Sequence, residues 1–585
     1  MIAPTPLWDR LRDLLARHPE GPIPDDELEA LRSCAGVRRT IIDFDLDYDD
    51  DDAYFFDFDP AEDELLEAGR RTAVREAVAA ALDGGDPGEL GTALRRIHEA
   101  KSGDDGEGPD LEGLSPPPER ARAVALHLLD TGTTGLEIEV GLLLLPGEPQ
   151  DLERVRVFGL LGSRAERFAV AAIGRSPNPA PHLLWTLERT DPDDRSERLD
   201  TFLELDFDTL ASLPAAAPVG TGADLVLELG AFERRPPAMH EDRRFAAPFL
   251  EAAEHARELT RDAASLSMLV RLHHGLAYGV AALLHFEPGE RVRAVEQFRS
   301  ALASDEAAAT AAAALDARPG DPDALWLVRQ TRRAARAEPE TFGEGFAVRI
   351  TVPAPSSDSD VRVNVLVDGM PLAERHLGDG GPENPETVLQ SGAGLSAGTE
   401  PHEILLGNAS CGDSRCCRPF IADVRLDAET GEVEWATRST ESAEPRTYRF
   451  DADAYAAEIA KAAADFTWEW PARRAARFLR ERLEAEPEVM ARWQCEPSPA
   501  RSDADETSCV RLYFAHPGVP ADFGSDTEWI QFRLILDFPD ALEVDDETIR
   551  AEVDRIVNKL RTEDPRSSET WCGGSQEMAE RLGYR

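Results

Sequence analysis

The chain has 585 residues, more than a single hydrophobic core organises, so we expect at least two domains. Hydrophobic residues make up 42% and charged residues 30%, which is typical of a folded globular protein and not of a disordered one. The 113 acidic and 63 basic residues give a net charge of −50, which argues against direct binding to nucleic acid or to an anionic membrane and favours a partner with a basic protein surface.

The sequence predicts a cytoplasmic protein. No run of about 20 uninterrupted apolar residues occurs, so no membrane-spanning helix is expected. Residues 1–19 lack the basic start and apolar run of a secretion signal and fit a short amphipathic helix instead. The seven cysteines are odd in number, and four of them stand apart from the others, which favours reduced thiols over a disulfide framework.

An acidic-aromatic segment, residues 41–60, follows two predicted helices within an N-terminal helical region at 1–110. In a strand its alternation would place aspartates on one face and apolar side chains on the other, and we expect the aspartates to be exposed. The D-x-D-x-D pattern lacks the Gly and Glu that a calcium loop requires. A solvated acidic loop is one interpretation and a docking arm for a basic partner is the other. The expected interaction residues are Asp43, Asp45, Asp47, Asp49, Asp50, Asp51 and Asp52.

Residues 111–338 are predicted to form a helical array, whose helix starts recur about every 15–17 residues between 119 and 194. Over about 115–335 this rhythm resembles degenerate HEAT-like repeat proteins, which implies stacked helices and an extended surface for protein binding. The alternation in 136–140 also fits a strand, and 221–236 is ambiguous. Helices are expected at 119–130, 134–145, 151–161, 164–174, 180–190, 194–206, 241–259, 263–285, 289–303 and 322–337.

The periodicity changes near residue 340 from helical to strand-like, so residues 339–585 are predicted to be a C-terminal α+β module with a largely antiparallel sheet. The expected fold class is therefore α+β and multidomain, mainly helical in its N-terminal and central parts. One sheet of four to six strands is expected from 346–352, 361–367, 402–408, 420–426 and 432–435. Further elements are expected as helices at 452–465, 471–486 and 546–561 and strands at 508–515 and 528–537.

A cysteine-containing turn at 407–417 is the strongest chemical motif. Together with the WEWP sequence of Trp468–Pro471, it resembles a module of unassigned activity that is common in actinobacterial proteins with high-GC genomes. Zinc bound by Cys411, Cys416 and Cys417 is the chemical alternative, but the C-x4-C-C spacing is not the usual C-x2-C and no matching second pair follows. We expect the three thiols to be close together, reduced and metal-free.

Other motifs give no catalytic site. Residues 394–398 match the G-x-S-x-G nucleophile elbow, but their neighbours read as loop. His273 and His274 occupy a largely apolar helix, where satisfied core or surface histidines are expected. No phosphate-binding loop or dinucleotide fingerprint occurs, so no cofactor is expected.

The leading interpretation is a non-catalytic interaction or scaffold protein that docks on basic protein surfaces. The first alternative is an enzyme whose site assembles from distant residues of the C-terminal module, such as His402, Asp413, Arg415 and Glu434. The second is an acidic inhibitor, DNA mimic or immunity-type protein that blocks a basic cleft.

Overall fold

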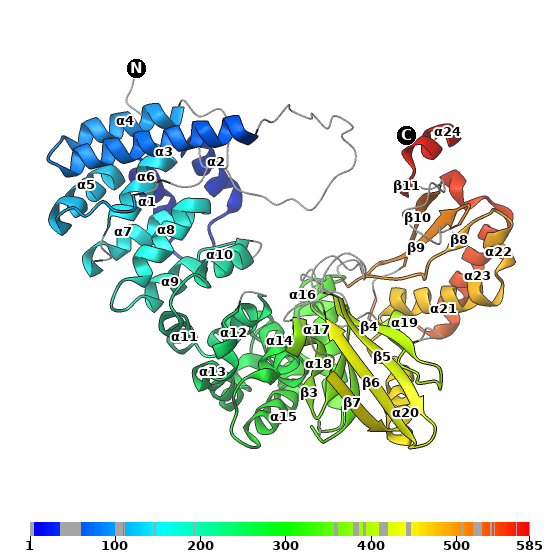
Figure 1. Cartoon of the computed structure of the whole chain (residues 1–585). Helices are drawn as coiled ribbons and strands as arrows, with labels where there is room; N and C mark the ends of the chain where they lie inside the picture. The colour runs from blue at the N-terminus through cyan, green and yellow to red at the C-terminus, as the bar shows by residue number, and fades with distance from the viewer. Residues whose placement is uncertain are drawn as a thin grey trace. The chain divides into compact units, whose positions relative to one another are not determined.

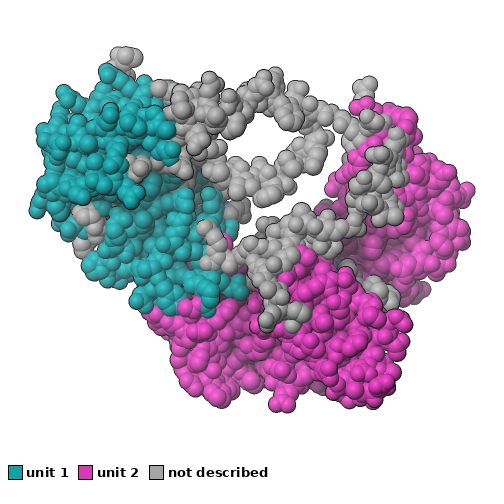
Figure 2. All heavy atoms as spheres, viewed as in Figure 1, with its two compact units in different colours: residues 1–218, 234–237 teal, residues 219–233, 238–585 magenta. Residues whose placement is uncertain are grey.

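The computed structural model places the chain in two compact units, shown in two colours in Figure 2. Unit 1 comprises residues 1–218 and 234–237, and unit 2 comprises 219–233 and 238–585. The structure describes residues 5–35, 60–99, 109, 111–145, 148–191, 194–232, 235–340, 342–355, 361–377, 385–389, 394–408, 419–439, 446–504, 507–518, 529–538, 541–542, 544–568 and 570–583.

Unit 1 is helical, as predicted (Figure 1). Within 110–210, every predicted helix is present in the described residues and none of the spans is a strand, so that prediction is confirmed. Its helices are α1 (Leu7–Arg17), α2 (Asp25–Ala35), α3 (Pro60–Leu82), α4 (Pro87–Glu99), α5 (Pro118–Thr131), α6 (Gly135–Leu144), α7 (Leu152–Phe158), α8 (Ser163–Gly174), α9 (Ala180–Leu187), α10 (Arg195–Phe202) and α11 (Phe207–Ala216).

The ambiguous residues 136–140 belong to helix α6. Glu137, at the third helical position, accepts hydrogen bonds from the backbone N–H of Thr133 and Thr134, which fixes the helix start. Its other oxygen accepts from Arg95 at 2.5 Å. Almost all of α6 is buried, so the sequence lacks the polar stripe that identifies a surface helix.

Unit 2 begins with a group of helices. They are α12 (Thr221–Ala231), α13 (Arg243–Glu254), α14 (Ala263–Tyr278), α15 (Glu290–Leu302), α16 (Asp305–Ala317) and α17 (Pro322–Arg336). Of these, α14, α15 and α17 line the cavity described below. The ambiguous span 221–236 is thus mainly helical in its described part. The border between the units lies near residue 218, inside the predicted array, and the domain borders predicted at 110 and 338 stay predictions.

The strands that follow form two antiparallel sheets, so the prediction of a single sheet is wrong. The strands are β1 (Phe346–Thr351), β2 (Arg362–Val367), β3 (Met370–Pro371), β4 (His402–Asn408), β5 (Pro419–Asp427), β6 (Glu432–Ser439) and β7 (Arg446–Asp451). β1, β2 and β3 make one sheet, and β4 to β7 make the other in chain order. Val363, Val424 and Trp435 belong to one continuous core, so the two sheets share their hydrophobic interior.

Helices and a third sheet complete unit 2. The helices are α18 (Leu372–Leu377), α19 (Pro385–Val388), α20 (Ala452–Ala463), α21 (Pro471–Ala485), α22 (Glu488–Ala491), α23 (Asp546–Thr562) and α24 (Gln576–Leu582). The sheet has the order β11-β10-β9-β8, formed by β8 (Glu496–Pro497), β9 (Cys509–His516), β10 (Ile530–Asp537) and β11 (Thr570–Gly574). The predicted fold class is confirmed, and two elements that the sequence did not predict, β11 and α24, follow the helix expected at 546–561.

Candidate functional site

A cavity of about 460 Å³ lies within unit 2 where α14, α15, α17, β1 and α20 meet. This volume falls within the range of sites that hold small organic molecules, about 300–1,000 Å³. Five cationic and three carboxylate side chains line it, although acidic residues outnumber basic ones almost twofold in the whole chain. The cavity is therefore a local exception to the acidic character of the protein.

Helix α14 supplies the two histidines of the cavity wall. The helix starts at Asp262, whose carboxylate accepts a hydrogen bond from the backbone N–H of Ser265. One turn before its end His273 and His274 line the cavity, with their ring centres 5.6 Å apart. Burial, helped by nearby arginines, lowers the pKa of His273 to about 4 and the pKa of His274 well below its usual value. Both imidazoles are therefore neutral at neutral pH.

The expectation that His273 has all its hydrogen bonds made is wrong for its Nε2 atom. The side chain is 8% exposed, and within the described part of the chain Nε2 has no hydrogen-bond partner. Buried ring nitrogens nearly always have a partner, since an unpaired one loses its bond to water without replacement. His273 is also one of the residues that line the cavity.

Tyr278, Glu340 and Arg349 form a fixed hydrogen-bonded group on the same cavity. The Tyr278 hydroxyl donates to Glu340 at 2.5 Å, and Nε of Arg349 donates to both oxygens of Glu340 at 3.2 Å. Arg349 also approaches Glu458 at 3.3 Å. Burial and the Glu340 carboxylate raise the pKa of Tyr278, so the phenol stays protonated. The Glu340 carboxylate is thus committed to partners from two elements.

The remaining cations differ in how far they are neutralised. Arg299 is paired with Glu296 at 2.6 Å, whereas within the described residues Arg333 has one ion pair, a 3.3 Å contact with Asp465. Arg336 and Lys461 line the cavity from exposed positions, and neither has a side-chain partner among the residues that the structure describes. Arg333, Arg336 and Lys461 therefore carry the positive charge that a ligand can meet.

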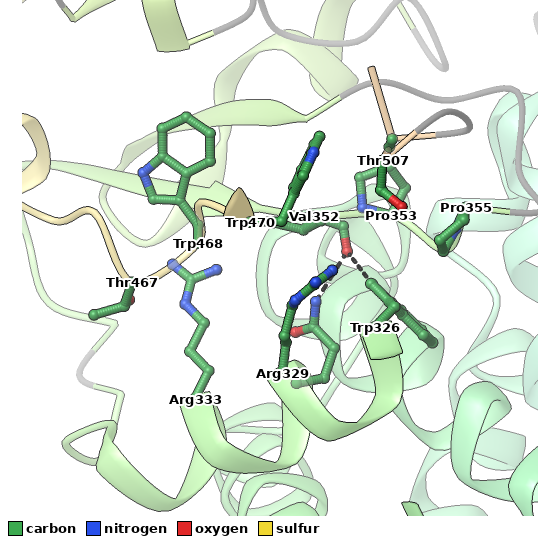
Figure 3. A pocket seen from close by; sticks show the side chains of 12 residues that line it. Trp326, Arg329, Arg333, Val352, Pro353, Pro355, Thr467, Trp468, Trp470 and Thr507 are labelled. Carbon is green, nitrogen blue, oxygen red and sulfur yellow. Dashed lines mark hydrogen bonds between the residues drawn. The ribbon is translucent and has the colours of Figure 1, made fainter. Parts of the chain in front are cut away.

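Figure 3 shows a second, much smaller cavity, which shares the lining residues Gln330, Arg333 and Thr467 with the first. Its volume is about 20 Å³, which is room for about one water molecule. Trp326 and Gln330 both donate to the Val352 carbonyl, at 3.0 and 3.3 Å, as the dashed lines in Figure 3 mark. We interpret this aromatic cavity as a packing feature that joins α17 to the chain after β1.

The WEWP sequence has a structural explanation close to these cavities. The indole N–H of Trp470 donates to Ser502 at 2.8 Å, and Arg473, which is fully buried, makes a bidentate ion pair with Glu386 at 2.6 and 2.7 Å. Glu469 is paired in the same way with Arg477. The motif therefore ties α21 to its surroundings, which gives these residues a role in stability.

The residues proposed from sequence lie in three situations. Asp43, Asp45, Asp47 and Asp49–Asp52, like Cys411, Asp413, Arg415, Cys416 and Cys417, lie outside the described residues. His402 and Glu434 are described, but they point to opposite faces of their sheet: His402 is in register with Val424 and Trp435, and Glu434 precedes Trp435. The G-x-S-x-G sequence is a loop in its described part, as expected.

Sequence reasoning missed most of the cavity. Its wall comes from five elements between residues 273 and 467, and of these lining residues the sequence alone singles out the histidine doublet. A usable signal was Lys461, since the chain contains three lysines and one of them is here.

Neither a metal-binding group among the described residues nor a similar protein points to a function for this chain. In the described ranges, no group of three His, Cys, Asp or Glu side chains is arranged to hold a metal ion. Among the same residues, each helix is too short or too polar to cross a membrane. Comparison with protein-family models, curated proteins and solved structures gives no match. The geometry of the cavity is therefore the feature from which a function can be inferred.

Proposed function

We propose that the chain is a non-catalytic binding protein and that unit 2 holds a small polar organic molecule in the α14–α17–β1–α20 cavity. The observation that carries this proposal is a cavity of ligand size lined by His273, whose buried Nε2 has no hydrogen-bond partner among the residues that the structure describes. Polar groups placed at a few points of a concave site fix the orientation of a ligand.

The protonation states in the cavity favour recognition over proton transfer. A general base works best with a pKa near the operating pH, whereas the pKa of His273 is about 4 and that of His274 is also far below its usual value. Tyr278 has a raised pKa, and Glu340 is held by two hydrogen-bond donors. These groups support binding without chemistry.

Filling the cavity should abolish ligand binding without unfolding the protein. Ala337 lines the cavity from the end of α17 and is exposed, so Ala337→Trp places an indole in the ligand space. Compounds from a set of polar metabolites that raise the melting temperature of the wild type should no longer raise it in this variant. The control is Ala335→Trp, since Ala335 is exposed on the same helix but is not part of the cavity wall. Equal shifts in both variants would place the ligand elsewhere.

Docking on a basic protein surface is a second candidate, favoured by the net charge of −50. The helix rhythm that resembles HEAT-like repeats supports it, because such arrays bind proteins along an extended surface. We also propose a cytoplasmic setting for both functions, which the odd number of cysteines in the sequence favours. We propose that the acidic-aromatic segment, residues 41–60, contacts the basic partner, and the reason is its negative charge.

Neutralising Asp49–Asp52 with asparagine should weaken capture of basic proteins from cytosol at low salt, because screened Coulomb attraction depends on these charges. Thermal stability should be unchanged or raised, since mutual repulsion is removed. The matched control neutralises four exposed carboxylates of unit 2, Glu241, Glu251, Glu254 and Glu258, with glutamine. Capture that is the same in wild type and the asparagine variant would end the docking-arm proposal.

A further inference from the structure

We infer that the ligand of this cavity is an organic anion whose acidic group binds between Arg333 of α17 and Nε2 of His273 on α14. The inference rests on the proposed function, because it names the chemical class of the molecule that the cavity holds. Two independent features support it: the unmet hydrogen bond of His273 and the distribution of charge around it.

The first feature is the imidazole itself. His273 packs edge-on against Tyr278, with ring centres 6.2 Å apart, so its orientation is restricted. A neutral imidazole with the proton on Nε2 donates one hydrogen bond from that atom. An oxygen of a carboxylate or phosphate accepts such a bond and would satisfy an atom that has no partner among the described residues.

The second feature is Arg333, which lines the same cavity as both histidines. Its positive charge contributes to the lowered pKa values of His273 and His274. Its one ion pair, through Nη2 to Asp465, leaves Nε and Nη1 without a partner in the described part of the protein. A planar guanidinium with free N–H groups is suited to carboxylate or phosphate oxygens.

The charges around the two groups favour an anion over a cation. Arg299 reinforces the positive potential at His273, although Glu296 partly offsets it. The Glu340 carboxylate is already bonded to Tyr278 and Arg349 and offers little to a ligand cation. Lys461 and Arg336, unpartnered within the described residues, add attraction for an approaching anion from exposed positions.

Titration calorimetry of the full chain tests the inference with two anions that share the required oxygen chemistry. Succinate represents carboxylates, inorganic phosphate represents phosphates, and succinamide is the neutral counterpart of succinate. We expect at least one anion to bind and succinamide not to bind. Arg333→Gln and His273→Phe should each weaken the binding at least tenfold. The control Arg332→Gln, at an exposed neighbour that is not part of the cavity wall, should leave it unchanged.

Lys461→Gln keeps the result interpretable if the inner variants unfold. Lys461 is exposed, so its replacement should preserve the melting temperature and weaken anion binding severalfold. An anion that binds equally to wild type, Arg333→Gln and Lys461→Gln would overturn the inference. Neutral compounds that bind the wild type but not Ala337→Trp, with neither anion binding, would overturn the inference and leave the proposed function standing. If no compound binds in the cavity, both fail.

Discussion

Replacing Arg473 by alanine should lower the free energy of unfolding of unit 2 by about 3–5 kcal/mol, the usual effect of breaking a buried ion pair. Arg473 is fully buried, and its guanidinium bonds both oxygens of Glu386 and the carbonyl of Ser502. Its removal leaves the Glu386 carboxylate, which is 8% exposed, without this charged partner. Urea unfolding followed by tryptophan fluorescence measures the loss, since Arg473 lies over the rings of Trp468 and Trp470.

The adjacent arginine provides the control for this prediction. Arg474 pairs with Asp546 at 2.7 Å, but the Asp546 side chain is 58% exposed. Arg474→Ala should therefore cost less than about 1 kcal/mol, as exposed ion pairs do. Replacing both Arg473 and Glu386 by methionine should cost less than Arg473→Ala, because no buried charge is left alone. Equal losses of unfolding free energy for Arg473→Ala and Arg474→Ala would contradict the interpretation that Arg473 and Glu386 form a buried, stabilising ion pair.

The helices could be predicted because the signals that define them are local. In α5 the buried residues Ala121, Val124, Ala125, Leu128 and Leu129 have the spacing of one helix face, and this spacing is visible in the sequence. The strands β4 and β5 were also predictable, since alternating burial along β5 follows the alternating side chains of a pleated strand.

Sheet membership was not predictable, because it depends on contacts between distant residues. Strands β2 and β4 have similar patterns, yet they belong to different sheets that share one core. Four strands were also missed for local reasons. β3 and β8 have two residues each, too few for a visible pattern. β7 is mostly exposed, with charged residues at both ends, and β11 carries two glycines, so neither has the alternating apolar pattern of a half-buried strand.

The candidate site was less predictable than the fold. A histidine next to arginines in space has a different protonation state from the same histidine in an isolated helix, and Arg299 and Arg333 are 26 and 60 residues away from His273 in the sequence. Whether Nε2 of His273 has a partner likewise depends on the packing of several elements. The sequence shows which residue types are present, but it does not show which of them lie close together in the fold or which hydrogen bonds they make.

That protonation state predicts how the stability of unit 2 depends on pH. The folded-state pKa of His273 is about 4, against an ordinary value of 6.5. Between these values the unfolded chain binds a proton at this residue and the folded chain does not, so acid favours unfolding. Stability should fall as the pH is lowered from about 7 to about 4, with a contribution of about 3 kcal/mol from this residue. His274 acts in the same direction.

His273→Phe should remove most of this contribution, so its loss of stability between pH 7 and pH 4.5 should be smaller than in the wild type. Urea midpoints at several pH values measure the difference. Carboxylates with lowered pKa values, such as Glu296, act mainly below about pH 4.5 and are present in both proteins. His255 is the control, because its pKa is raised by a hydrogen bond to the Glu251 carbonyl, so His255→Gln should change the slope in the opposite direction. A His273→Phe protein with the wild-type slope would show that burial does not hold this imidazole neutral.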